Sequence, residues 1–226
     1  MTRRYTKAGL LMLVLALGGI SVIIVTDRPE KQNTGQSAVT NQIRALSISH
    51  LVCEFLSKQD DARSIDELAS HLSEVFSSKT PQPSPEHKIG RCDKKLNEKE
   101  YSLLSTMFIT LPLDEAYLEL LKHFNLEAKS VSELVKALGN SVASSFDIYY
   151  TDDKKQLLGF SVEKDDKRIY VVVNFSYDMH DLPLPLGFMA STKIKLWKSD
   201  SGEVNEFVTQ GPLSIDLLST AVIIVD

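Results

Sequence analysis

The residue types most often used in catalysis are scattered along this chain rather than gathered in motifs. No histidine belongs to an H-x-H or H-E-x-x-H pattern, the spacings that bring two imidazoles onto one zinc ion. The chain also lacks G-x-S-x-G, the Walker phosphate loop and G-x-G-x-x-G. The sequence therefore predicts no metal, no cofactor and no enzymatic activity. The histidines are His50, His71, His87, His123 and His180.

Two pairs of neighbouring carboxylates, Asp152-Asp153 and Asp165-Asp166, have the residue type that general acid–base catalysis uses in a desolvated cleft. Each pair has a lysine beside it, Lys154 or Lys167, and lies between two apolar stretches. That context is typical of a hairpin turn, and we expect these carboxylates to be solvated.

Trp197, the only tryptophan, alternates with Lys193 and Lys195 on the face opposite Ile194 and Leu196. An exposed tryptophan here could stack on a sugar ring or fill a pocket of a protein partner, so Trp197 is a possible binding residue. If both faces of its sheet are covered, Trp197 packs under the helices instead. The sequence leaves both arrangements open.

The only two cysteines, Cys53 and Cys92, predict a disulfide, since an even pair in an exported protein is usually bonded. The bond would close a loop of about 40 residues, which the chain-entropy model values at roughly 3–4 kcal/mol. Two unpaired buried thiols are the alternative. Asn174-Phe175-Ser176 fits a glycosylation sequon, but at the end of an apolar strand we expect it to be structural.

An uncharged run from Ala8 to Val25 follows Arg3, Arg4 and Lys7. As a helix, these 18 residues would span about 27 Å, close to the ~30 Å bilayer core. The preceding basic residues predict a cytoplasmic N-terminus. We therefore expect a single-pass signal-anchor that contacts membrane lipid through residues 8–25, with a periplasmic or extracellular body. A signal peptide cleaved near residues 16–18 is the alternative, and it also exports the body.

The exported part is acidic. Three of the 25 basic residues and none of the 30 acidic ones precede the apolar run, which leaves 22 against 30 and a net charge of −8. Nucleic acid needs clustered lysine and arginine, so no nucleic-acid partner is expected. The same charge disfavours a body that lies flat on anionic lipid.

The pattern along the chain predicts an α+β fold. Residues 1–26 are expected to be a cytoplasmic stub and transmembrane anchor, 27–40 a linker, 41–143 a helical region and 144–226 an antiparallel β-sheet or small sandwich. Capping boxes predict helices that start after Ser64, with Glu67, and after Asn97, with Glu100. Residues 62–72 and 128–138 align without gaps, which indicates either a duplicated helical hairpin or two generic amphipathic helices.

From residue 146 the apolar period changes to two, and strands are expected at 146–150, 157–162, 169–175, 192–197, 203–208 and 217–225. The last of these is apolar on both faces at 221–225. We expect it inside the sheet, with the helical region packed over one face.

Residues 146–176, FDIYYTDDKKQLLGFSVEKDDKRIYVVVNFS, resemble the start of the C-terminal β-sandwich of the α-amylase-type glycosidase family. That domain also accompanies heavy chains of certain amino-acid transporters. LPLPLG (182–187), LWKSDSG (196–202) and the ending LSIDLLSTAVIIVD are similar to its later part. The family's catalytic barrel does not carry over, because residues 41–143 are too few for a fold of about 250 residues. The resemblance therefore implies a non-catalytic module that packs against a partner.

These observations predict a membrane-anchored, non-enzymatic protein whose exported α+β body binds a protein of an envelope or membrane complex. A carbohydrate-binding or glycosidase-derived non-catalytic module is one alternative, supported by the resemblance and by Trp197. A secreted factor released by signal cleavage is the other.

Overall fold

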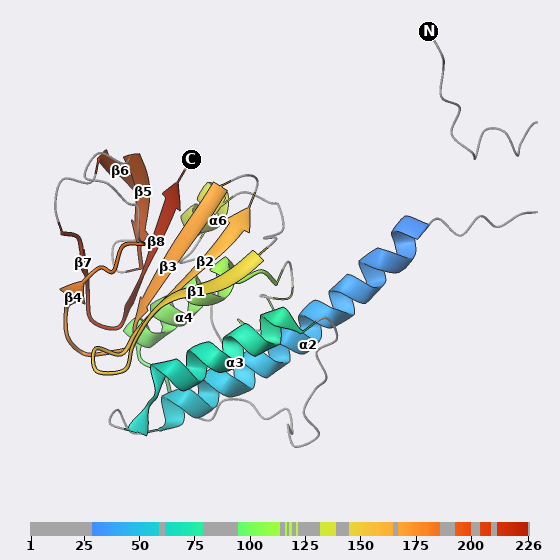
Figure 1. Cartoon of the computed structure of the whole chain (residues 1–226), viewed down its shortest axis with the longest axis horizontal. Helices are drawn as coiled ribbons and strands as arrows, with labels where there is room; N and C mark the ends of the chain where they lie inside the picture. The colour runs from blue at the N-terminus through green and yellow to red at the C-terminus, as the bar shows by residue number, and fades with distance from the viewer. Residues whose placement is uncertain are drawn as a thin grey trace, which may run out of the picture. The chain divides into compact units, whose positions relative to one another are not determined.

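The computed structural model describes residues 29–58, 62–78, 95–113, 132–138, 145–164, 167–185, 193–199, 204–208 and 212–225, together with Ala116, Leu118 and Leu121. The side chains of the first of these segments are described from Ala38 onward. The chain divides into two compact units, Met1–Gly35 and Gln36–Asp226. The second unit has the expected α+β fold, with a helical region followed by an antiparallel sheet (Figure 1).

Both predicted helix starts are found, although one is capped differently from the prediction. At Asn97 the capping box is complete, with Glu100 N donating to Asn97 Oδ1 at 2.9 Å and Asn97 N donating to Glu100 Oε2 at 2.8 Å. Ser64 Oγ accepts the N–H of Glu67 at 3.2 Å, but the Glu67 carboxylate instead binds Lys58 Nζ at 3.1 Å. The helices described are α2 (Pro29–Ser57), α3 (Ile65–Ser77), α4 (Glu98–Thr110) and α6 (Ser132–Leu138).

Residues 27–40, which the sequence predicts to be a linker, are helical from Pro29 onward, where α2 begins. Proline fits the first turn of a helix, where its missing N–H has no intrahelical partner. The polar residues that follow include good helix formers, and the single Gly35 costs only about 1 kcal/mol. A polar composition here did not indicate an irregular backbone.

Within the described part of the chain, no helix is long and apolar enough to cross a membrane. The Ala8–Val25 run lies outside the described residues. So does most of 114–131, which would have completed the second helical hairpin, and the duplication therefore stays a prediction.

Among the described residues, the main sheet has six strands in the order β1-β2-β3-β8-β5-β6, and every neighbouring pair is antiparallel. Its strands agree with the predicted ones: β1 (Ser145–Asp152), β2 (Leu157–Lys164), β3 (Lys167–Asn174), β5 (Lys193–Lys198), β6 (Val204–Val208) and β8 (Ser219–Val225). The last strand lies between β3 and β5, which confirms that the chain ends inside the sheet. The sequence did not predict the short pair β4 (His180–Asp181) and β7 (Ser214–Ile215).

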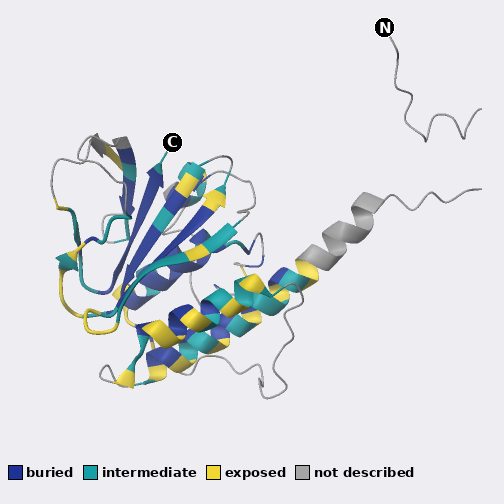
Figure 2. Ribbon diagram, viewed as in Figure 1, coloured by how far each residue is buried: buried dark blue, intermediate teal, exposed yellow. Residues whose placement is uncertain are grey.

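Both faces of the sheet are covered, and each face has its own apolar cluster (Figure 2). On one face, Phe160, Val171 and Val222 pack with α2, α3 and α4. On the other face, Leu157, Val172 and Ile223 pack with Leu182 and with Ile215 of β7. Alternation along each strand therefore sends side chains into two separate cores.

The Tyr149 side chain joins the second face of the sheet, the one opposite the helices, to the segment that covers it. Its ring lies over Gly159 of β2, where an added Cβ would come 3.0 Å from the Tyr149 ring and 2.9 Å from Tyr150 Cβ. The ring meets Tyr170 edge-on with centroids 5.5 Å apart, and its hydroxyl lies 3.4 Å from Pro183 O. Burial raises the pKa of Tyr149 well above its usual range, and nearby Tyr170 adds to the shift.

We predict that Ile223→Ala lowers the free energy of unfolding by about 2–5 kcal/mol, since it leaves a cavity in a fully buried central strand. Thermal unfolding followed by circular dichroism measures the change. Val39→Ala, at an exposed position of α2, is the control and should stay within about 0.5 kcal/mol of the parent chain. Similar melting of the two variants would show that β8 is not central to stability.

Candidate functional site

Large apolar side chains are held in solvent on the loop that joins β3 to β4. This β3–β4 loop comprises residues 175–179 and lies at the end of β3 (Figure 1). Tyr177 is 56% exposed and Met179 is 63% exposed. Aromatic and methionine side chains are enriched in protein interfaces relative to the rest of the surface. The β3–β4 loop is therefore the candidate interaction site.

Asn174, the last residue of β3, organises this loop from a fully buried position. Its Nδ2 donates to the carbonyl oxygens of Asp178 and Asp216, both at 2.8 Å. Its Oδ1 accepts from the N–H of Ser176 at 2.9 Å and from Ser176 Oγ at 2.8 Å. Because the amide nitrogen is buried and both of its hydrogens are bonded, the Asn174-Phe175-Ser176 sequon has a structural role, as predicted.

Ser176 and His180 are close enough to suggest a nucleophile and its base, with Oγ 3.0 Å from Nε2. Such a pair works only if the imidazole accepts the hydroxyl proton. Here Oγ also accepts from the N–H of Asp178 at 3.1 Å. It lies 2.8 Å from Asn174 Oδ1 and 3.2 Å from Asp178 O, two carbonyl oxygens that compete with the imidazole for the single hydroxyl proton. The hydroxyl is fully engaged inside the loop, so the pair holds the loop in place.

Backbone hydrogen bonds fix both ends of the loop to the fold. Phe175 N donates to Gln156 O at 3.0 Å, and Leu218 N donates to Ser176 O at 2.9 Å. Leu182 N, just beyond β4, donates to Leu213 O at 2.7 Å. The Phe175 ring is buried against Phe55 of α2 with ring centroids 4.9 Å apart. Tyr177 and Met179 therefore project from a segment that is attached to the sheet, to α2 and to the residues that cover the face of the sheet opposite the helices.

The surface around the two apolar side chains is acidic. Asp178 and Asp181 are exposed on either side of Met179 and His180. Asp216 is half-buried, and its carboxylate lies 3.8 Å from Lys198 Nζ. This part of the chain therefore combines exposed apolar area with carboxylates.

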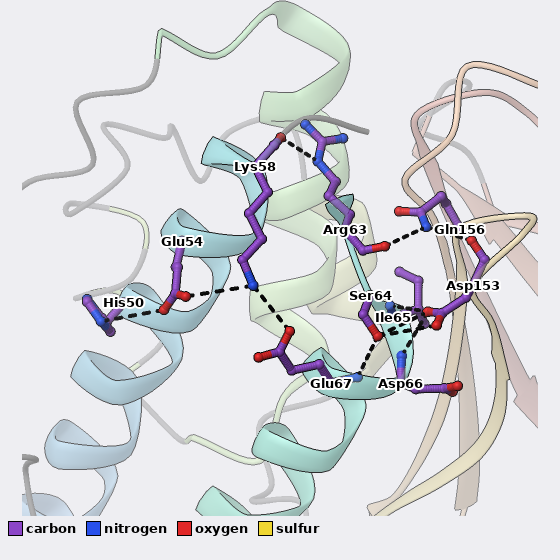
Figure 3. A network of polar contacts seen from close by, with 10 residues as sticks. All are labelled: His50, Glu54, Lys58, Arg63, Ser64, Ile65, Asp66, Glu67, Asp153 and Gln156. Atoms are coloured by element: carbon purple, nitrogen blue, oxygen red, sulfur yellow. Dashed lines mark hydrogen bonds and ion pairs between the residues drawn. The ribbon is translucent and has the colours of Figure 1, made fainter. Parts of the chain in front are cut away.

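A second polar network joins α2, α3 and the β1–β2 turn (Figure 3). The Asp153 carboxylate accepts the N–H groups of Ile65 and Asp66, the latter at 3.1 Å, and lies 3.2 Å from Ser64 Oγ. Gln156 Nε2 donates to Arg63 O at 3.2 Å. A carboxylate at a helix N-terminus satisfies unpaired N–H groups and interacts favourably with the positive end of the helix dipole. Asp153 is an exposed turn residue, as the sequence predicts, and its carboxylate in addition attaches the turn to α3.

The same network continues through Lys58, the residue that follows α2. Its Nζ lies 3.1 Å from Glu67 Oε2 and 3.7 Å from Glu54 Oε1, and Glu54 lies 3.9 Å from His50. The hydrogen bond that Lys58 donates to Glu67 raises the pKa of Lys58. These are exposed ion pairs of the kind that contribute little individually, and they fit a structural role.

Trp197 is 1% exposed and packs in the core on the helix side of the sheet. Of the two arrangements left open by the sequence, the structure has the covered one, so an exposed sugar-stacking Trp197 is wrong. The reason is that both faces of the sheet are covered. The sequence reasoning did correctly separate Trp197 from Ile194 and Leu196, which lie in the opposite cluster.

Cys53 lies half-buried on α2 beside the core, and no free cysteine is found in the part of the chain that the structure describes. Cys92 lies outside the described residues, so the Cys53–Cys92 bond stays a prediction. Among the described residues, no group of three or more histidine, cysteine, aspartate or glutamate residues could hold a metal ion.

The sequence reasoning missed Tyr177 and Met179 as candidate site residues. The available signal was Tyr177-Asp178-Met179-His180-Asp181, in which large apolar residues alternate with acids immediately after a buried strand. Asn174 drew attention only as a sequon, and its bond to Asp216, 42 residues away, has no local signal.

No family model and no curated protein matches the chain. Among solved structures, an exported protein from Bacteroides fragilis is 21% identical over 34% of this chain and 16% of that chain, with a TM-score of 0.27. A GH30 endoxylanase from Clostridium papyrosolvens is 10% identical over 42% of this chain and 26% of that chain, with a TM-score of 0.31. An α-amylase from Geobacillus thermoleovorans is 12% identical over 57% of this chain and 34% of that chain, with a TM-score of 0.35. These likenesses are partial, and the chain spans about a third or less of the length of each of these proteins.

We predict that Asp153→Ala destabilises the protein by about 0.5–2 kcal/mol, the usual cost of losing a helix cap. The N–H groups of Ile65 and Asp66 lose their acceptor in this variant. Lys154→Ala, at the adjacent exposed position, is the control and should change stability by less than about 0.5 kcal/mol. Equal melting temperatures for the two variants would contradict the attachment of the turn to α3.

Proposed function

We propose that the chain is a single-pass membrane protein without enzymatic activity, whose exported α+β body binds a partner protein of an envelope or membrane complex. One observation carries the binding half of this proposal. Asn174 and Ser176 serve internal contacts of the β3–β4 loop, whereas Tyr177 and Met179 remain exposed on it.

The membrane half rests on the sequence. The Ala8–Val25 run is long enough for a bilayer, and Arg3, Arg4 and Lys7 precede it. The N-terminus is then cytoplasmic and the acidic body periplasmic or extracellular. An acidic body is repelled by anionic lipid, which leaves its surface available to proteins.

The proposed lack of enzymatic activity is supported by how the candidate groups are used. The Ser176 hydroxyl is engaged by Asn174 and Asp178, and the Asp153 carboxylate caps α3. An activated nucleophile or general base needs a proton partner that changes during the reaction. Neither group has that freedom.

A non-catalytic module related to the C-terminal β-sandwich of the α-amylase-type glycosidases is the second candidate. Residues 146–176, which carry that resemblance, form β1, β2, β3 and the start of the β3–β4 loop. A sugar-binding role would have to use aromatic residues other than the buried Trp197. A module of this origin that packs against a protein agrees with the first proposal.

Two measurements on native membranes test the proposal together. The full-length chain should stay in the pellet after carbonate extraction, and protease added to the outer face should digest its body. In a mild detergent, native electrophoresis should place it in an assembly with a second protein, well above the 25.2 kDa of the chain.

Release into the soluble fraction with a new N-terminus near Gly19 would contradict the anchor and favour the secreted factor. Migration as a single chain, corrected for bound detergent, would contradict partner binding.

A further inference from the structure

We infer that the β3–β4 loop is the docking surface itself, and that it takes a positively charged segment of the partner protein with Tyr177 and Met179 as its apolar anchors. This inference rests on the proposed function and adds the surface and the chemistry of the partner. It is argued from how firmly the loop is held and from the charges around it.

The loop is organised before any partner arrives. Asn174, Ser176 and Asp178 form a closed set of hydrogen bonds of 2.8–3.1 Å, and Leu218 N ties Ser176 O to the segment before β8. A segment that already has its bound conformation loses little entropy on association. Exposed side chains on such a segment give more affinity than the same side chains on a mobile one.

The two exposed side chains suit a protein contact. Tyrosine is among the residues that most often dominate binding energy, and methionine adapts its shape to varied apolar surfaces. Tyr177 and Met179 stand two positions apart, on opposite sides of Asp178 in sequence. The loop thus presents two exposed apolar side chains with exposed carboxylates between and beside them in sequence.

The charges around the loop indicate the sign of the charge that the partner segment should carry. Asp178 and Asp181 are exposed within and beside the loop, whereas Asp216 is already paired with Lys198. The whole exported part also carries −8. Complementary charge steers association and disfavours wrong partners, so the partner segment should present lysine or arginine around an apolar contact.

The same charges disfavour two other occupants. In a symmetric dimer formed through this loop, Asp178 and Asp181 of one copy would face those of the other across the interface. Anionic lipid would be repelled for the same reason. A basic protein segment is the occupant that matches both the apolar and the acidic parts of the surface.

Photocrosslinking of the full-length chain in its native membrane tests the inference. Benzoylphenylalanine, which keeps an aromatic ring, replaces Tyr177, and the same probe at Val39 and at Glu206 provides matched exposed controls. Mass spectrometry of the adduct identifies the captured chain and the charge of the segment that contacts the probe.

We expect the probe at position 177 to give one protein adduct whose contacting segment is net positive. In that background, Asp178→Lys combined with Asp181→Lys should reduce the adduct yield about fivefold to tenfold, and high salt should act in the same direction. Met179→Ala should reduce it at least about tenfold, and melting curves should show that all variants remain folded.

Several outcomes would overturn the inference. They are an adduct of twice the chain's mass, an adduct with lipid only, an adduct with an acidic or neutral segment, and a yield that ignores both aspartates. If the probe at 39 or 206 captures a protein and the probe at 177 does not, docking at the loop is wrong while partner binding stands. If no position captures a protein and the native gel shows a single chain, the proposed function fails as well.

Discussion

The final strand, β8, is apolar on both of its faces, and most of the architecture follows from covering both. Val222 and Ile224 face the helices, while Ala221 and Ile223 face the other side. The helical region covers the first face, and the β4–β7 pair with Leu182 covers the second. Because β4 begins only six residues after β3 ends, the chain must turn sharply at Asn174 to supply that cover.

The sharp turn explains why the candidate site is where it is. A buried asparagine supplies the hydrogen bonds that a regular strand would otherwise provide, and Ser176 completes them. Backbone groups in a turn this close to the core must be paired, since an unpaired buried group costs about 1–3 kcal/mol. With the inner positions committed to these bonds, Tyr177 and Met179 are left outside.

The helical side is joined to the sheet by polar contacts as well as by apolar packing. Thr220 of β8 donates through Oγ1 to Leu103 O of α4 at 3.1 Å, and Ser102 Oγ donates to Ser199 O at 2.8 Å. Arg44 of α2 donates to the carbonyl oxygens of Val75 and Ser78 at the end of α3. Asp153 caps the other end of α3. Each contact gives a buried or terminal backbone group its partner.

The sequence predicted the elements whose signal is local. The period of two located the six main strands, the residues apolar on both faces placed β8 inside the sheet, and Asn97 with Glu100 marked the start of α4. It failed where the deciding partner is distant or the element is short. Asp153 acts on a helix 87–88 residues away, and β4 and β7 are two residues each.

The candidate site was missed for the same reason. Asn174 also donates to Asp216 O, 42 residues away, a contact that no local pattern reveals. Large apolar residues after a strand ordinarily indicate further burial. Only the arrangement of the residues that cover the face of the sheet opposite the helices shows that Tyr177 and Met179 remain in solvent.

Amide hydrogen exchange on the full-length chain in detergent micelles tests the central claim, that covering the second face holds the β3–β4 loop rigid. The N–H of Ser176 is bonded to Asn174 Oδ1 and that of Leu218 to Ser176 O. Both should exchange at least about 100-fold more slowly than in an unstructured peptide, an opening free energy of about 3 kcal/mol. Exchange of both at the unstructured rate would contradict a preorganised loop.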